Sequence, residues 1–248
     1  MPRYFLEVSY KGTAYSGFQK QDNANTIQAE IEKAFSVLQK NNIEITGSSR
    51  TDAGVHALQN FFHFDYDNSI QPQFLYKLNA ILPIDIVAVN IQQVGDDAHC
   101  RFDATSRAYR YFIHQAKNPF LYDRAYYYPY TIDFEKLNEA AKLIMQYVNF
   151  TSFSKRNTQV KSFECRIEQS EWKIEEKLWI YHVKANRFLR GMVRGLTGTM
   201  LQVGRDKISI ENLKTIIEGM DNSKAYFAVP AKGLFLEKVE YPDHIYKR

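Results

Sequence analysis

The sequence predicts an α+β fold built from two halves, each with the element order β-α-β-β-α-β. Its 248 residues are enough for two domains of roughly 120 residues each. Runs of alternating apolar and polar residues are separated by segments with apolar residues at helical spacing, and this order occurs twice. No residue-level repeat accompanies it, so element order alone indicates the duplication. We expect the halves to be residues 1–104 and 105–248.

The first half contains two helical segments among four strands. The first helix carries Ile27, Ile31, Ala34, Phe35 and Leu38 on one face, and Asn25 with Gln28 can form a capping box at its start. In chain order, the expected elements are a strand at 4–10, this helix, strands at 43–46 and 61–64 on either side of a polar loop, a helix at 72–82 and a strand at 84–94.

The second half repeats this order with one additional short helix. Its expected elements are a strand at 105–115, a helix at 133–147, paired strands at 163–174 and 179–185, helices at 188–201 and 210–218, and a strand at 234–241. Split β-α-β units of this kind are called ferredoxin-like. Two of them side by side can form a mixed, mainly antiparallel sheet with a central cleft.

Composition limits the binding partners, the metal or disulfide sites and the cellular location that we expect. The formal charge of +4 and the pI of about 8.8 are compatible with a polyanionic partner but do not establish one. The 17 Tyr and 17 Phe residues can fill cores or stack on unpaired bases. Cys100 and Cys165 suggest neither a disulfide framework nor a closely spaced metal-ligand pair. With no signal-peptide pattern and no apolar run of membrane-spanning length, we expect a cytoplasmic protein.

The decapeptide at 47–56, Gly-Ser-Ser-Arg-Thr-Asp-Ala-Gly-Val-His, concentrates chemically active side chains. Its Thr-Asp-Ala-Gly core is also ordinary turn chemistry, in which Asp bonds nearby backbone and Gly accepts a positive φ. The functional alternative rests on density, because Arg50, Asp52 and His56 lie in one short loop that flanking strands can present to a ligand.

The run Arg50-Thr51-Asp52-Ala53-Gly54-Val55-His56 resembles the signature of the TruA family of tRNA pseudouridine synthases. Further resemblances follow in the same order along nearly the whole chain, at 10–19, 149–153 and 231–236. There are two departures. Ser49 stands where a glycine commonly precedes the arginine, and Gln59-Asn60 replaces a usual Gly-Gln, so details of the loop backbone are expected to differ.

This resemblance implies a site assembled from three distant segments. Asp52 is the catalytic carboxylate in the first segment. Tyr109, in the segment 101–111, takes the place of the active-site tyrosine. Arg194, in the segment 184–194, matches the arginine that pairs with the catalytic aspartate, and this pair would keep the acid ionised in an aromatic cleft. Without the resemblance, Tyr109 is best interpreted as a core aromatic residue.

Basic residues near these segments are candidates for RNA contact. Strand spacing places Arg107, Tyr109 and Tyr111 on one face. Arg187 and Arg190 are spaced to share a helical stripe with Arg194, which is either a hydrated face or an RNA-facing ridge. The basic segment 155–161 has the same two interpretations. Arg50 is the candidate wedge that helps a base leave its stack.

The resemblance implies an isomerase that converts uridine to pseudouridine in the anticodon stem-loop, at tRNA positions 38–40, without cofactor or metal and as a homodimer. Asp52 either adds to C1′ of the ribose or assists a glycal route, and both remain open.

Two other functions are alternatives to the isomerase interpretation. A non-catalytic RNA-binding module would make Asp52 dispensable. A metal hydrolase would use Asp52, His56, His63 and His99, although these residues lack helical i, i+4 spacing and a carboxylate cluster that joins them.

Overall fold

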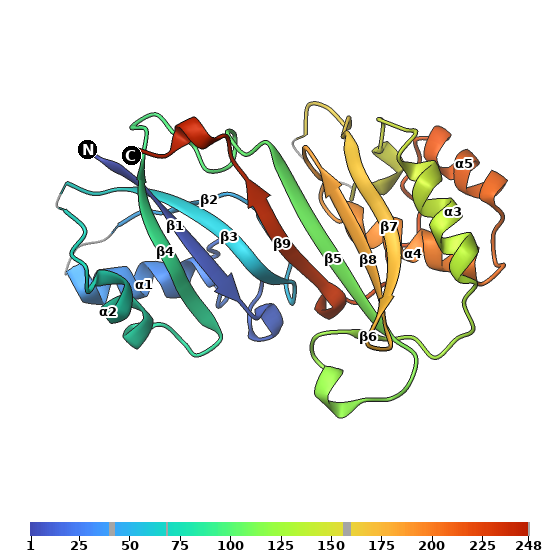
Figure 1. Cartoon of the computed structure of the whole chain (residues 1–248), viewed down its shortest axis with the longest axis horizontal. Helices are drawn as coiled ribbons and strands as arrows, with labels where there is room; N and C mark the ends of the chain where they lie inside the picture. The colour runs from blue at the N-terminus through green and yellow to red at the C-terminus, as the bar shows by residue number, and fades with distance from the viewer. Residues whose placement is uncertain (40–42, 68, 156–159, 248) are drawn as a thin grey trace. The chain divides into compact units, whose positions relative to one another are not determined.

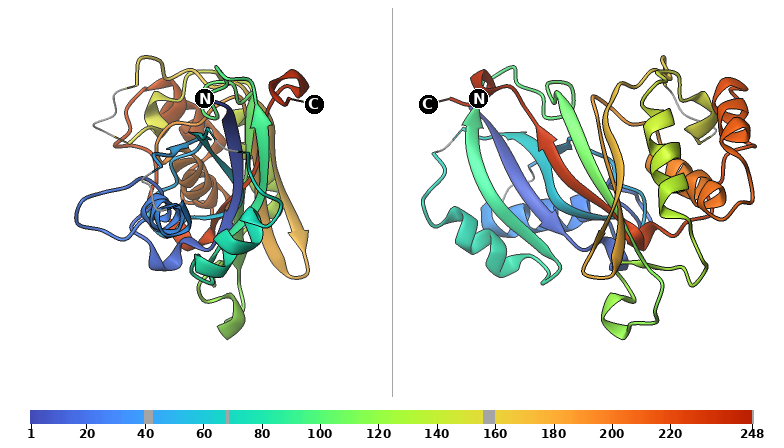
Figure 2. Two further views of the ribbon diagram at one scale, coloured as in Figure 1. Left: turned by 90° about the vertical axis from the view of Figure 1, so that its left-hand side faces the viewer. Right: turned by 45° about the vertical axis from the view of Figure 1, so that its right-hand side comes forward.

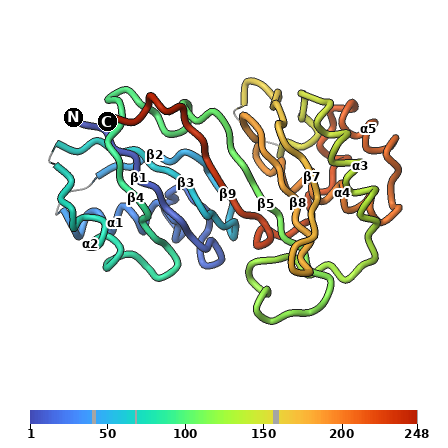
Figure 3. Tube along the Cα trace, in the orientation of Figure 1, coloured from blue at the N-terminus to red at the C-terminus, as the bar shows by residue number. Residues whose placement is uncertain are grey.

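The computed structural model describes all residues except 40–42, 68, 156–159 and 248. The chain forms two compact units. The first combines Met1–Thr105 with Phe235–Arg248, and the second is Ser106–Leu234. The sequence placed 105–248 in a single half, whereas the last segment of the chain belongs to the first unit. Figure 3 follows this return of the chain from α5 (orange) to β9 (red).

The first unit has a sheet in the order β4-β1-β3, to which β2 and β9 add at the free edge of β3. Neighbouring strands are antiparallel except β9, which runs parallel to β3 where His56 faces Phe235. Its elements are β1 (Arg3–Tyr10), the 3-10 helix Gly12–Ala14, α1 (Ile27–Gln39), β2 (Thr46–Gly47), β3 (His56–Asp65), α2 (Phe74–Ile81), β4 (Ile86–Val94), β9 (Leu234–Glu240) and the 3-10 helix Asp243–Ile245.

The core of the first unit lies between α1 and one face of its sheet (Figures 1 and 2). Phe62 and Phe64 on β3 point to this face, and the Phe64 ring lies 5.0 Å from Phe35 of α1. Phe62 stacks on Phe18 at 4.6 Å. Each such ring contributes about 1.5–3 kcal/mol when it is removed from water. Alternation then directs Phe61, His63 and Asp65 to the opposite face.

The second unit has a sheet in the order β5-β8-β7, with β6 pairing parallel to β5. The paired strands β7 and β8 are joined through Glu176 and Lys177, both with positive φ, as a two-residue hairpin turn requires. Its elements are β5 (Ser106–His114), the 3-10 helix Pro119–Leu121, β6 (Tyr126–Tyr127), α3 (Phe134–Ile144), the 3-10 helix Thr151–Phe153, β7 (Ile167–Glu175), β8 (Leu178–Ala185), α4 (Met192–Gly204), α5 (Ile210–Glu218) and the 3-10 helix Ala231–Gly233.

Helix α4 is the central element of the second unit, because nearly all of its side chains are buried. It packs against α3 and α5 (Figure 1). Small residues allow this burial. Thr199 donates to the carbonyl of Gly195 in its own helix at 2.8 Å and accepts from the backbone N–H of Tyr226 at 3.0 Å. The segment after α5 is thereby held against α4.

The α+β class, mixed and mainly antiparallel, is confirmed. Several local expectations are wrong, among them the following three. The strand expected at 43–46 is reduced to Thr46–Gly47. The capping box of Asn25 and Gln28 does not form. Instead, α1 begins at Ile27, and the hydroxyl of Thr26 accepts from the N–H of Ala29 at 3.3 Å. The helix expected at 188–201 begins later, at Met192. None of the described helices has the length and apolar character that spanning a membrane requires.

Candidate active site

The Asp52 segment is a tight turn that leads directly into β3. The N–H of Val55 donates to the carbonyl of Asp52 at 3.1 Å, and Gly54, the third residue of the turn, has φ +77°. A positive φ at this position is typical of a type II turn and favours glycine. The expected use of Gly54 is therefore confirmed. The polar loop is shorter than expected, since Gly47 belongs to β2 and His56 to β3.

The loop after β1 holds this turn from one side. The hydroxyls of Tyr10 and Thr51 lie 2.8 Å apart, and the carbonyl of Thr51 accepts from the N–H of Phe18 at 3.1 Å. Gly12 lies so close to Val55 that a Cβ at Gly12 would be 2.0 Å from the Val55 carbonyl oxygen. Two backbones in direct contact thus fix the position of the turn.

Asn60 and Gln59, which replace the usual Gly-Gln of the family, both hold neighbouring segments in place. Asn60 is buried and donates through Nδ2 to the carbonyl of Ser49 at 2.9 Å and to the Tyr10 hydroxyl at 3.1 Å. Gln59 bridges the sheet, donating to Glu7 at 3.0 Å and accepting from the N–H of Val239 at 3.1 Å. Both substituted side chains are therefore structural supports of the Asp52 loop and of β9.

The three polar residues of the loop have different environments. Arg50 is exposed and Asp52 is half-buried. His56 is 1% exposed, its Nδ1 accepts from the N–H of Gly12 at 3.1 Å, and its ring lies 4.5 Å from that of Phe235. His56 is thus committed to packing and to holding the loop after β1. The arginine and the carboxylate remain as the residues that can meet a ligand.

In the second unit, the β5 register places Arg107, Tyr109 and Tyr111 on one face, opposite Ala185, Val183 and Tyr181 of β8. Tyr109 is half-buried, and its ring meets the edge of the Phe188 ring at 5.0 Å. Arg107 is buried, with an Nη1 contact of 3.5 Å to the carbonyl of Asn186. Tyr109 therefore packs against Phe188 and is also partly exposed to solvent. Both properties are compatible with a ring that stacks on a base.

Arg194 is positioned by the segment at 229–230, which follows α5. Its Nε donates to the carbonyl of Val229 at 2.9 Å, and the Tyr111 hydroxyl donates to the next carbonyl, that of Pro230, at 2.7 Å. Burial raises the pKa of Tyr111, and the nearby Arg194 charge opposes this shift. Tyr111 therefore stays protonated as a donor. Sequence reasoning missed Val229 and Pro230, because carbonyl acceptors leave no pattern in side-chain types.

The expected helical stripe of Arg187, Arg190 and Arg194 is wrong. Gly191 adopts φ +76° before Met192 and so separates the first two arginines from α4. Arg190 is exposed, and its carbonyl accepts from the N–H of Lys155 at 3.0 Å. Arg190 and the start of the basic segment at 155–161 thus lie together, whereas residues 156–159 are outside the described part of the chain.

The structure brings together Arg50, Asp52 and His56 in the first unit, and separately Tyr111 and Arg194 in the second. Tyr109 shares the β5 face of Tyr111. The Asp52–Arg194 pair stays a prediction. The expected metal-hydrolase group does not gather in the described part of the chain. There, the residues that could hold a metal ion are His63, His99 and Cys100, without Asp52 or His56.

Comparison with known proteins covers Asp52 and Arg194, whereas Tyr109 lies outside the two stretches that match the family model. The family model described as "tRNA pseudouridine synthase" matches residues 7–103 and 147–242. A tRNA pseudouridine synthase A from Parabacteroides distasonis is 42% identical over 248 residues, covering 99% of this chain and 98% of the relative. Its counterpart from Bacteroides thetaiotaomicron is 42% identical over 250 residues, with coverages of 99% and 93%. That from Clostridium acetobutylicum is 41% identical over 244 residues, with coverages of 95% and 98%. This chain belongs to the tRNA pseudouridine synthase family.

Proposed function

We propose that this chain isomerises uridine to pseudouridine in the anticodon stem-loop of tRNA, with Asp52 as the essential carboxylate. The observation that carries the proposal is the fixed Asp52 turn, which lies inside the matched region 7–103 and leaves Asp52 half-buried beside an exposed Arg50. The isomerisation breaks the N1–C1′ bond, turns the base and joins C5 to C1′. The proton lost from C5 is balanced by one gained at N1, so the reaction needs no oxidant or reductant.

Asp52 acts at the sugar in this proposal, either by adding to C1′ or by removing a neighbouring proton on a glycal route. A half-buried turn suits both, because the carboxylate is held in place while solvent is partly excluded. The reacting base must leave its stack, at a cost of a few kcal/mol. Arg50, exposed next to Asp52, is the proposed wedge.

Tyr109 and Arg194 complete the proposed catalytic group. The Tyr109 ring stacks on the free uracil, and its hydroxyl serves proton transfer at C5. Arg194 supplies the cation that we propose to pair with Asp52. Its Nε donates to the carbonyl of Val229, which orients the guanidinium. Arg107, on the Tyr109 face of β5, contacts RNA near the reacting nucleotide.

The proposed tRNA contact outside the reacting base uses Arg187, Arg190 and the segment 155–161. Cationic side chains bind phosphates whatever the base sequence. They would therefore orient the anticodon arm of the tRNA and would not distinguish one RNA sequence from another. We also propose that the protein acts as a homodimer in the cytoplasm. An anticodon arm is an extended ligand, and two copies would offer it a larger basic surface than one.

The decisive experiment compares the wild type with Asp52→Asn on an unmodified tRNA transcript. The variant keeps the size and turn chemistry of the residue but removes the charge. We expect normal folding and tRNA binding with multiple-turnover activity lost. Asp22→Asn, an exposed acid of the same unit, is the matched control and should behave like the wild type. Pseudouridine mapping without added cofactor provides the measurement.

Two results would contradict the assignment. Turnover by Asp52→Asn comparable to the wild type would remove Asp52 from the catalytic role. Tight tRNA binding by the wild type without any pseudouridine formation would instead favour the non-catalytic RNA-binding module.

A further inference from the structure

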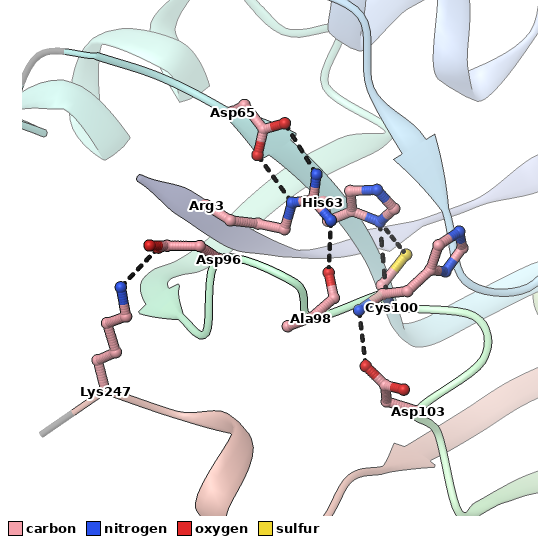
Figure 4. Close-up of polar contacts among 9 residues, drawn as sticks. Arg3, His63, Asp65, Asp96, Ala98, Cys100, Asp103 and Lys247 are labelled. Atoms are coloured by element: carbon pink, nitrogen blue, oxygen red, sulfur yellow. Dashed lines mark hydrogen bonds and ion pairs between the residues drawn. The ribbon is translucent and has the colours of Figure 1, made fainter. Parts of the chain in front are cut away.

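We propose that His63, His99 and Cys100 form a binding site for a divalent zinc ion. One ligating atom from each residue lies within 4.8 Å of the other two. His63 is on β3, and Cys100 is on the turn that follows β4 (Figure 4). His99 precedes Cys100 in the same turn. The proposal does not depend on the isomerase activity, because the group includes none of the proposed catalytic residues.

The donor set matches the preferences of zinc. One thiolate and two imidazoles form a three-ligand set that leaves a fourth position for water. With Zn–N bonds of about 2.0 Å and a Zn–S bond of about 2.3 Å, tetrahedral ligand atoms lie roughly 3.3–3.6 Å apart. His63 Nδ1 and Cys100 Sγ are already 3.2 Å apart, and the His63 and His99 rings are 4.6 Å apart at an angle of 64°. A contraction of about 1 Å therefore brings the three atoms around one ion.

Hydrogen bonds hold the backbone of the turn that carries His99 and Cys100. The Tyr241 hydroxyl donates to the carbonyl of Cys100 at 2.6 Å. The N–H of His99 donates to Asp103 Oδ2 at 2.7 Å. Arg3 donates to the carbonyl of Ala98 at 2.9 Å (Figure 4). Ligands that are positioned before the metal arrives lose less conformational freedom on binding.

A metal ion binds the neutral form of an imidazole and the deprotonated form of a thiol. Cys100 Sγ gives up its 3.1 Å hydrogen bond to the carbonyl of Thr46, and its proton is released to solvent.

Charges of both signs lie around the group. The guanidinium of Arg3 is paired with both oxygens of Asp65, at 2.7 and 2.8 Å, and Arg101 directly follows Cys100 in the chain. Asp103 adds a negative charge beside His99. A cavity of about 570 Å³ reaches His63 and is lined by Glu44, Asp65 and Asp67 among others. It provides a route by which a hydrated cation can approach.

Zinc here would link two segments of the first unit. It would join β3 to the turn at 98–103, through which the chain leaves β4. Metal binding to the folded state alone stabilises that state in proportion to RT ln(1 + [L]/Kd). We therefore expect zinc to raise the thermal midpoint of the protein.

The test uses the full-length chain stripped with a chelator and titrated with Zn²⁺ by calorimetry and with Co²⁺ by absorbance. We expect one equivalent of Zn²⁺ to bind, release of one proton, and a thermal midpoint several degrees higher. Co²⁺ should give a thiolate-to-metal charge-transfer band, which reports a sulfur ligand. Cys100→Ala should abolish this band, whereas Cys165→Ala, which removes the other cysteine of the chain, should keep it.

His99→Gln keeps the proposal testable if Cys100→Ala folds poorly, because His99 is only half-buried. This variant should lose at least 100-fold in Zn²⁺ affinity. His244→Gln, near the C-terminus, is its control and should bind as the wild type does. Absence of stoichiometric Zn²⁺ binding by the wild type would overturn the proposal. So would equal Co²⁺ spectra for the wild type and Cys100→Ala, or an unchanged affinity in His99→Gln.

Discussion

The most direct test of how the Asp52 turn is positioned is Gly12→Ala. A Cβ at this residue would lie 2.0 Å from the carbonyl oxygen and 2.8 Å from the carbonyl carbon of Val55. Gly12 does not have a positive φ, so alanine introduces no strain of its own. Both obstructing atoms are backbone. The Asp52 turn or the loop at 11–19 must therefore move.

The required movement sets the size of the effect. Real Cβ atoms essentially never approach closer than 3.0 Å, so the two backbones must separate by about 1 Å. A misplacement of this size in a catalytic group costs about 100-fold in rate. Overpacking of a well-packed region costs about 1–3 kcal/mol of stability. We therefore expect a folded protein with kcat lowered about 100-fold and tRNA affinity nearly unchanged.

Single-turnover pseudouridine formation on a saturating tRNA transcript measures this loss without a contribution from product release. Gly95→Ala is the matched control in the same unit, because its Cβ would meet only the movable side-chain oxygen of Asp97, at 3.2 Å. It should retain wild-type turnover. Wild-type turnover by a correctly folded Gly12→Ala would refute the argument that this backbone contact fixes the position of the Asp52 turn.

Three further predictions concern the second unit. Arg194→Met should lose activity most severely at acid pH, because Asp52 would lack its cation; a pH–rate profile with the wild-type shape would contradict the pairing. Tyr109→Phe should bind tRNA normally but release tritium from uracil C5 slowly, whereas Tyr109→Leu should also lose stacking worth roughly 1–3 kcal/mol; wild-type release by Tyr109→Phe would exclude the hydroxyl. Replacing Arg187 and Arg190 together with Ala should lower the slope of log affinity against log salt by about one unit per lost phosphate contact, and an unchanged slope would place the RNA-binding face elsewhere.

Periodicity predicted most regular elements well, because each has a strong amphipathic pattern. The helix at 210–218 coincides with α5, whose apolar residues Leu213 and Ile217 are buried. The start of α4 was harder to predict. Apolar residues at 188 and 189 continue the helical pattern, but Gly191 adopts a left-handed conformation that only the folded backbone reveals. The arginines before it were therefore assigned to the wrong local structure.

The partner of the last strand could not be predicted from local patterns. Residues 234–241 have the alternation of a strand, and β9 covers most of them. Alternation identifies a strand and its buried face, but it contains no information about which edge the strand will join. The parallel pairing of His56 with Phe235 joins residues that are far apart in the sequence, and the segment that begins at Phe235 belongs to the first unit.

In the candidate site, residues that act through side-chain chemistry were easier to predict than residues that act through shape or through backbone atoms. Asp52, Arg50 and Tyr109 were proposed as site residues because their segments resemble the motifs of the family. Gly12 and Asn60 were not, because each acts through shape or through a backbone atom. Asn60 reaches the carbonyl of Ser49, so the two departures from the family pattern are physically connected. A change in the loop at residue 49 is thus accompanied by a donor at residue 60 that satisfies the carbonyl of that same residue. Substitution at either position should be judged by its effect on this bond and, through it, on where the turn places Asp52.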